Sequence, residues 1–268
     1  MWTDNPFKDV IAQRNQPLWL ILAFQSGFMN AGGFLACGRF VSHVTGYGTY
    51  VGVAFAQRNY LNAVEMGLAP LFFLAGAAYS GWLIDRRLML GQRPRLLTGV
   101  VWLALLNLII CVGEDLGFFG TFGEPLLLQR DFALLFLLSF ACGLQNGLFV
   151  GVTDGKIRTT HLTGPTTDMG INLAKIFTYR RDDPERGQLS ALNWLKTKIA
   201  IAFSSGSMIA TLVFSMMTYQ GFAVPFVTSL GLIWYVHRLL KIGEGEPRQG
   251  QPLSVLIPVE PPGGSGTA

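Results

Sequence analysis

The side chains best suited to bind or move a charged group occur twice, once in each half of the chain. The repeated residues, at an offset of 118 (161 − 43), are His43 with His161, Thr45 with Thr163, and Gly46 with Gly164. Histidine changes charge near neutral pH, so the two histidines are candidates for coupling protons to another process. The alternative is a pair of neutral imidazoles that hydrogen-bond to the backbone around an irregular turn.

An acid and two amides extend this set of polar residues. Asp168 follows the second copy of the motif, and a carboxylate at membrane depth is costly and usually functional. Asp168 is therefore a third candidate for proton coupling; the alternative places it in water, outside the membrane. Asn30 and Asn146 repeat at nearly the same offset (146 − 30 = 116), and they could line a binding cavity or tie neighbouring helices together.

The repeated threonine and glycine predict the start of a short helix in each half. Free backbone N–H groups and the positive end of a helix dipole would then lie near Thr45-Gly46 and near Thr163-Gly164. Two such helix starts that face each other form a site for an anion or for one end of a zwitterion. These four residues, together with Asn30 and Asn146, are the candidate substrate-binding residues. Threonine is also an ordinary helix cap, which is the alternative for Thr45 and Thr163.

Motifs for a metal, a cofactor or a catalytic centre are missing from the sequence. The cysteines at 37, 111 and 142 are far apart and form no C-x-x-C pair or Cys/His cluster, so we expect no metal site. The chain also lacks a glycine-rich phosphate loop, an H-E-x-x-H pair and a G-x-S-x-G turn. We therefore expect no cofactor and no enzymatic activity.

The composition indicates an all-α integral membrane protein. Half of the 268 residues are hydrophobic, only 13% are charged, and the mean hydropathy is +0.40, whereas soluble domains carry about 25% charged residues. Six apolar stretches approach the ~20 residues that a helix needs to cross a bilayer. They lie at about 18–36, 66–84, 97–113, 133–150, 197–217 and 221–240.

The six stretches divide the chain into one membrane domain with polar ends. We expect a cytoplasmic segment at 1–16, a membrane domain at 17–242 and a disordered cytoplasmic tail at 243–268. Two further segments, 44–57 and 162–175, are each 14 residues long, or about 21 Å as a helix, which is too short to cross. They could be re-entrant, interfacial or tilted. We expect a re-entrant element in each: a short strand, a glycine turn and a half-helix, the first from Thr49 and the second from Thr166.

Counting lysine and arginine distinguishes the topologies. With six crossings and a cytoplasmic N-terminus, 17 of the 20 basic residues lie inside and only Arg39, Arg58 and Arg130 outside. If the two short segments also crossed, the division would be 13 to 7, so the positive-inside rule favours six crossings and two cytoplasmic termini. Three crossings per half make the second repeat (about 133–240) inverted relative to the first (about 17–113), and the two histidine-bearing segments then meet near the midplane.

Between about residues 18 and 240 the chain resembles the YoaK-like family of multi-pass membrane proteins of unknown function. The matching motifs are Gly-Phe-Met-Asn at 27–30, His-Val-Thr-Gly at 43–46, Gly-Leu-Gln-Asn at 143–146 and Arg-Thr-Thr-His-Leu-Thr-Gly at 158–164. Asn30 stands where the family usually has Asp, and Tyr47 where it has Asn. If that Asp accepts protons in relatives, the role is absent here or has moved, with Asp168 as its candidate. The resemblance implies a membrane location and this fold, and no established substrate.

Three functions remain open at this stage. The leading one is a secondary transporter or channel for a small polar or anionic solute, because a duplicated re-entrant segment suits a site at a repeat interface. The first alternative is a membrane scaffold or regulatory protein, and the second is an intramembrane enzyme acting through His43, His161 and Asp168. We expect the inner or plasma membrane as the location, the lipid bilayer and the solute as partners, a homodimer as an assembly that would suit six helices, and no nucleic acid.

Overall fold

Helices form every regular element of the part of the chain that the computed structural model describes, residues 5–124 and 129–245. In chain order these are α1 (Gln16–Cys37), α2 (Val44–Ala56), α3 (Tyr60–Leu83), α4 (Asp85–Met89), α5 (Leu96–Gly113), α6 (Gln129–Val152), α7 (Thr163–Thr178), α8 (Pro184–Met217), the 3₁₀-helix η1 (Thr218–Phe222) and α9 (Ala223–Gly245). The expected tail at 243–268 lies almost wholly outside the described residues.

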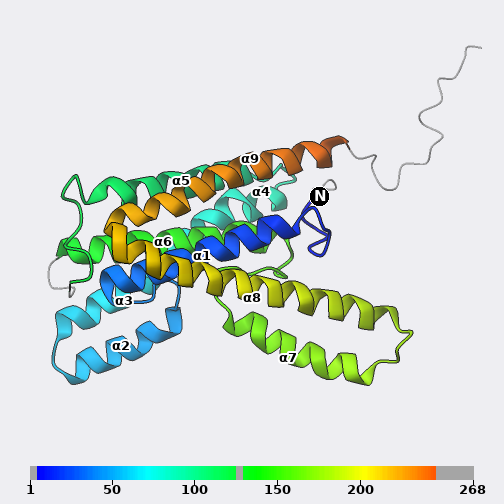
Figure 1. Cartoon of the computed structure of the whole chain (residues 1–268), viewed down its shortest axis with the longest axis horizontal. Coiled ribbons are helices and arrows are strands. Elements are labelled where there is room, and N and C mark those ends of the chain that lie inside the picture. Colours follow the sequence, from blue (N-terminus) through cyan, green and yellow to red (C-terminus); the bar gives the residue numbers. More distant parts are fainter. Residues whose placement is uncertain (1–4, 125–128, 246–268) are drawn as a thin grey trace, which may run out of the picture.

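Five stretches of helix are long and apolar enough to cross a membrane. They are Gln16–Cys37, Tyr60–Met89, Leu96–Gly113, Phe132–Val152 and Pro184–Ile242. The last is 59 residues long, and it contains α8 and α9 with η1 between them, where the chain reverses direction (Figure 1). The chain is a multi-pass helical membrane protein, as the composition predicted.

Local signals explain where several of these helices begin and end. Proline occupies the first turn of both α1 and α8, where its missing N–H leaves no hydrogen bond unmade. The Asp183 carboxylate accepts a hydrogen bond from the Glu185 backbone N–H at 2.9 Å at the start of α8. Gly38 ends α1 with a φ of 63°, a left-handed conformation that costs glycine little.

Two close helix pairs are built on glycine. α1 packs against α8, and α3 packs against α6. A Cβ added at Gly27 of α1 would overlap the Phe203 carbonyl of α8, and one added at Gly143 of α6 would overlap the Phe73 carbonyl of α3. Small residues of this kind let helix backbones approach closely in membranes, where packing rather than the hydrophobic effect holds helices together.

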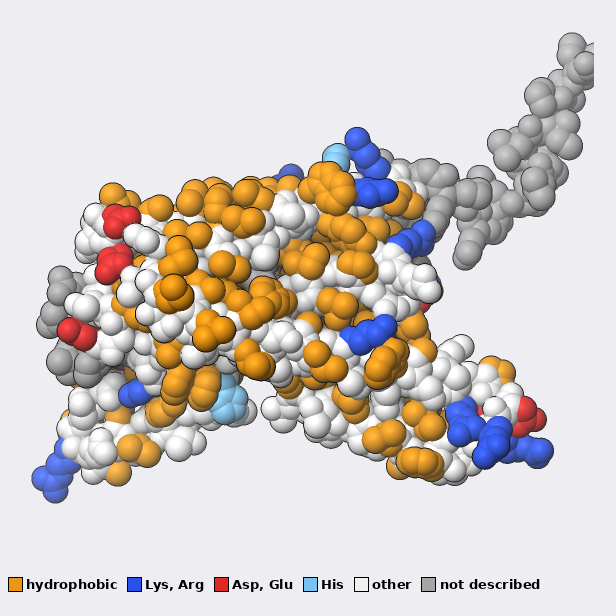
Figure 2. Space-filling model, viewed as in Figure 1, with side chains coloured by type: hydrophobic (Ala, Val, Ile, Leu, Met, Phe, Trp, Pro, Cys, Tyr) orange, Lys and Arg blue, Asp and Glu red, His pale blue; other side chains and the backbone are white. Residues whose placement is uncertain are grey.

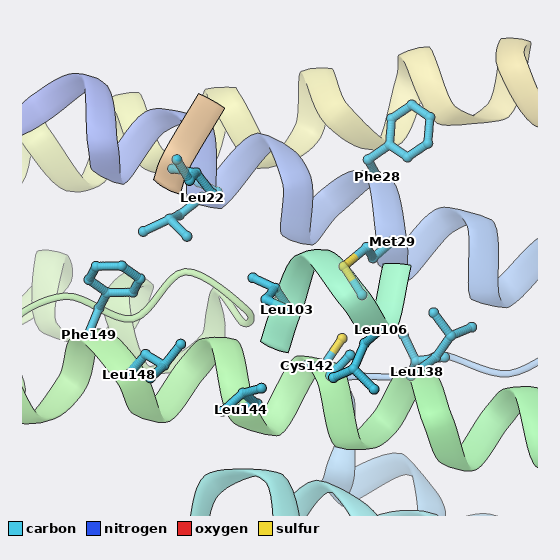
Figure 3. Close-up of a cluster of buried hydrophobic side chains, with 14 of the residues drawn as sticks. Leu22, Phe28, Met29, Leu103, Leu106, Leu138, Cys142, Leu144, Leu148 and Phe149 are labelled. Carbon is cyan, nitrogen blue, oxygen red and sulfur yellow. The ribbon is translucent and has the colours of Figure 1, made fainter. Parts of the chain in front are cut away.

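The centre of the bundle is filled by side chains from three helices. Figure 3 shows Leu22 and Met29 of α1 lying toward Leu103 of α5 and Cys142 of α6, and all four are buried. A polar contact crosses the same region, because Gln145 Nε2 donates hydrogen bonds to the Leu22 carbonyl at 2.9 Å and to Ser26 Oγ at 2.7 Å. This core fixes α1, α5 and α6 and leaves α2 and α7 at its edge.

The short helices α2 and α7 each pack mainly on one neighbour, α2 on α3 and α7 on α8. Both begin near the middle of the molecule and run toward opposite ends (Figure 1). Their lengths of 13 and 16 residues correspond to about 20 and 24 Å, less than a ~30 Å hydrocarbon core.

The expected strand before each half-helix is wrong for the described residues, which contain no strand. The helices also start earlier than predicted, at Val44 rather than Thr49 and at Thr163 rather than Thr166. Side chains replace the missing strand partner in the first half: Tyr47 Oη donates to the Phe40 carbonyl at 2.9 Å. A backbone whose polar groups are satisfied in this way needs no ladder.

Candidate functional site

The start of α2 brings together three residues that the sequence singled out. His43 Nε2 and Thr45 Oγ1 lie 3.1 Å apart, within hydrogen-bond distance, and both residues are exposed. The Gly46 N–H donates to the His43 carbonyl at 3.0 Å, and a Cβ at Gly46 would meet the imidazole at Nδ1, 2.7 Å away. The imidazole therefore lies against Gly46 and within hydrogen-bond distance of a threonine hydroxyl.

Asn30 ties the segment before α2 to α1. Its Oδ1 accepts hydrogen bonds from Ser42 Oγ at 3.0 Å and from the Ser42 N–H at 3.4 Å. This contact is a tie between α1 and the segment before α2, and the binding role of Asn30 stays a prediction. Ser42, which has no place among the predicted site residues, is the partner in this tie.

At the start of α7, a histidine again precedes a threonine and a glycine, but the side-chain contacts differ from those at α2. Thr163 and Gly164 are exposed and His161 is half-buried, with its Nε2 facing the position that a Cβ at Gly164 would occupy. His161 lies outside the five spanning stretches. Its pKa is lowered from the ordinary histidine value, first because burial disfavours the charged ring and second because Arg158 adds like-charge repulsion.

The second half has no counterpart of the Asn30–Ser42 tie. Asn146 matches Asn30 and Thr160 matches Ser42 in the repeat, but Asn146 Oδ1 and Thr160 Oγ1 are both buried without a hydrogen-bond partner. The connection to the half-helix is also longer, residues 153–162 between α6 and α7 against 38–43 between α1 and α2. Both roles predicted for Asn146 stay predictions.

Asp168 forms an ion pair that the sequence did not reveal. Lys196 Nζ of α8 donates to Asp168 Oδ2 at 2.8 Å, and the side chains are 7% and 60% exposed respectively. Next to this pair, Asn172 Nδ2 donates to Asn193 Oδ1 at 2.9 Å, and Asn193 Nδ2 donates to the Met169 carbonyl at 3.1 Å. The polar interface between α7 and α8 therefore contains a nearly buried cation, Lys196.

Two cavities adjoin α7 and α8. One of about 650 Å³ is lined by Lys8, Asp9, Val10, Ile11, Lys156, Lys175, Tyr179, Glu185, Gln188, Leu189 and Leu192. The other, of about 350 Å³, is lined by Asp154, Gly155, Lys156, Asp168, Ile171, Asn172, Lys175, Leu192 and Lys196. Asp168 is the one predicted site residue among these linings, and Lys196 is the charged residue that sequence reasoning missed.

The starts of α2 and α7 face a hollow on the surface of the molecule. Figure 2 shows this hollow between the two lobes that α2 and α7 form in Figure 1, with a histidine side chain at its edge. Thr45 and Thr163 do not line either of the two cavities beside α8. Within the described ranges, no group of three or more His, Cys, Asp or Glu could hold a metal ion.

Comparison with known proteins identifies the family and goes no further. No curated protein and no solved structure matches the chain. The model of a family described as a protein of unknown function, DUF1275, matches residues 18–235, which include every helix that carries a candidate site residue; the narrower YoaK-like name stays a prediction. The chain belongs to the DUF1275 family.

Proposed function

We propose that this protein is a secondary transporter or channel for a small polar or anionic solute. The observation that carries the proposal is the placement of α2 and α7, two helices too short to span a membrane, whose starts lie at the edge of a multi-pass bundle, about halfway along its length (Figure 1). Non-helical backbone at membrane depth survives where protein buries it or where it lines a water-filled cavity. The hollow between the two helix starts (Figure 2) is the place that we assign to such a cavity.

The chemistry at these helix starts suits an anionic or zwitterionic solute. Each presents backbone N–H groups and the positive end of its dipole. Thr45 and Thr163 add exposed hydroxyls, and His43 and His161 add titratable rings beside them. The two histidines and Asp168 stay the candidates for proton coupling.

The packing of the helices supports two inverted repeats with six crossings. Exchanging α1 with α6, α2 with α7, α3 with α8 and α5 with α9 turns the α1–α8 contact into the α6–α3 contact and the α2–α3 contact into the α7–α8 contact. The same exchange turns the contact of Gly27 with the Phe203 carbonyl into that of Gly143 with the Phe73 carbonyl. In Figure 1, α1 and α6 run in opposite directions, as inverted repeats require.

Charge supports a cytoplasmic location for both termini. The start of the chain and the end of α9 lie at the same end of the molecule (Figure 1). Lysine and arginine gather toward that end, whereas the acidic side chains of the opposite end are visible in Figure 2. Acidic loop residues Glu114, Asp115 and Glu124 follow α5.

We expect single cysteines to be labelled according to this topology. In a cysteine-free background, a membrane-impermeant maleimide added to intact cells should label Glu114→Cys and leave Arg93→Cys unlabelled until the membrane is permeabilised. The reason is that the 17 to 3 division of basic residues places the loop between α3 and α5 inside. Labelling of Arg93→Cys in intact cells would contradict the six-crossing topology.

The proposed function predicts solute flux that depends on the two helix starts. Protein in liposomes should pass at least one solute of a panel containing acetate, succinate, phosphate and glycine, measured as uptake above protein-free liposomes. Thr45→Val and Thr163→Val should each weaken apparent solute affinity by about 3- to 10-fold, because a hydrogen-bonded hydroxyl contributes about 0.5–1.5 kcal/mol.

Thr211→Val is the matched control, because Thr211 is an exposed threonine of α8 that donates to the Ser207 carbonyl at 3.0 Å and belongs to neither helix start. Its uptake should equal that of the unmodified protein. If no solute of the panel gives flux above protein-free liposomes, the transporter proposal fails and a scaffold role becomes the better explanation.

A further inference from the structure

We propose that the cavity of about 350 Å³ beside α7 binds a small carboxylate on Lys196, in competition with the carboxylate of Asp168. The inference rests on the proposed function, because it names the class of solute that the chain carries. It adds a second binding place, at Lys196, to the two helix starts, which do not line this cavity.

Lys196 is the fixed partner of this exchange. Its side chain is only 7% exposed, and an ionised ammonium removed from water needs an anion beside it. Nζ donates to Asp168 Oδ2 at 2.8 Å, which uses one of its three N–H donors. Lys196 lies on α8 directly before the predicted span at 197–217, at the margin of an apolar stretch.

Asp168 is the replaceable partner. Its side chain is 60% exposed, so its carboxylate loses little when it leaves Lys196 for water, and pairs with an exposed member are weak. Lys196 lacks that freedom and must receive another anion in return. Because the group already seated on Lys196 is a carboxylate, a carboxylate from solution satisfies the same geometry.

The surrounding cavity has the size and the charge for such a solute. A volume of about 350 Å³ is at the lower end of the range for small-ligand pockets. Besides the ion pair, its charged lining residues are Lys156, Lys175 and Asp154. When Asp168 has left Lys196, the cavity holds three lysines and one other acid, Asp154. This positive balance favours an anion, and Lys156 or Lys175 can pair with the second carboxylate of a dicarboxylate.

Displacement also affects how α7 is held. The Asp168–Lys196 pair joins α7 to α8, and the Asn172–Asn193 hydrogen bond one turn further along α7 remains when the pair opens. A bound carboxylate therefore removes a tie on the side of α7 that is nearer its start at Thr163. Solute binding and the freedom of the half-helix are coupled through one side chain.

The test measures equilibrium binding of succinate to the purified full chain in nanodiscs by calorimetry, with uncharged succinamide as the matched probe. Asp168→Asn removes the competing charge at nearly constant volume and should bind succinate about 10-fold tighter than the unmodified protein. Lys196→Gln should bind it at least about 10-fold more weakly, because the anion loses its buried partner.

Lys198→Gln is the control, since Lys198 lies on the same helix but donates to Gln16 Oε1 at 3.0 Å outside the cavity lining. The variant Asp168→Asn/Lys196→Gln, which leaves no unpaired charge, should bind as weakly as Lys196→Gln. The inference is overturned if Lys196→Gln and Lys198→Gln weaken succinate binding equally. It is also overturned if Asp168→Asn binds succinate more weakly than the unmodified protein, or if succinamide binds as tightly as succinate. If succinate binds as expected but no solute of the panel is transported, the carboxylate site is supported and the transporter proposal fails. If another solute is transported but succinate does not bind, the transporter proposal is supported and the carboxylate site fails.

Discussion

A single methyl group added at Gly27 or Gly143 is expected to destabilise the protein by about 3 kcal/mol or more. The new Cβ of Gly27→Ala would overlap the Phe203 carbonyl, and that of Gly143→Ala the Phe73 carbonyl. The opposing atom is backbone in both cases, so it cannot turn aside as a flexible side chain does. The two helices must separate along their length, which forfeits the close packing that holds membrane helices together.

Thermal unfolding in detergent, followed with a thiol-reactive dye, measures this effect, because Cys37 and Cys142 are buried in the folded chain. Gly231→Ala in α9 is the matched control: a Cβ there meets nothing within 4 Å, and alanine should stabilise the helix by up to about 1 kcal/mol. Alanine at Gly27 or Gly143 should therefore lower the unfolding midpoint, and alanine at Gly231 should raise it. A midpoint for Gly27→Ala or Gly143→Ala equal to that of Gly231→Ala would show that these glycines do not set the helix distance.

Trp19→Ala is expected to cost about 3–5 kcal/mol, the usual range for deleting a buried tryptophan. Trp19 is fully buried, its ring stands edge-on to Phe149 at a centroid distance of 5.7 Å, and its Nε1 donates to the Val10 carbonyl at 3.0 Å. The substitution leaves a cavity between α1 and α6 and frees the segment before α1. We therefore expect faster backbone amide hydrogen exchange at residues 5–15, in addition to a lower free energy of unfolding.

Trp19→Phe separates the two effects, because it keeps an aromatic ring and removes only the indole donor, worth about 1 kcal/mol. Trp234→Ala, at a position 61% exposed, should change the unfolding midpoint little. Unchanged exchange at 5–15 in Trp19→Ala would contradict the anchoring of that segment through Trp19.

The positions of the long apolar helices and of the two short helices could be predicted from the sequence, because hydrophobic length is a local property. The stretch at 97–113 became α5 almost residue for residue, and 44–57 became α2. The strand was wrong because glycine and β-branched residues around 39–44 indicate only that the chain is irregular there. What satisfies its backbone is Ser42 meeting Asn30 and Tyr47 meeting Phe40, contacts between residues 7 to 12 positions apart.

The site could be predicted only in part. The repeat motif located His43, Thr45 and Gly46 beside one another, since they are neighbours in the chain. It could not reveal the partner of Asp168, which lies 28 residues away on α8. The predicted span at 197–217 began one residue after Lys196, whereas α8 begins at Pro184. A lysine at the margin of an apolar stretch was therefore counted as a topology signal, although its position on a continuous helix was the available indication of a buried charge.

The unmatched tie between the halves has an energetic consequence. Ser42 donates two hydrogen bonds to Asn30, so moving the first half-helix away from its scaffold means breaking them, at about 0.5–1.5 kcal/mol each. Asn146 Oδ1 and Thr160 Oγ1 have no such bond to break. In the second half the ties lie further along the helix, where Lys196 meets Asp168 and Asn172 meets Asn193 between α7 and α8. The first short helix is thus held at its start and the second along its length, so the same outward pull would first load hydrogen bonds to α1 in one case and an ion pair to α8 in the other.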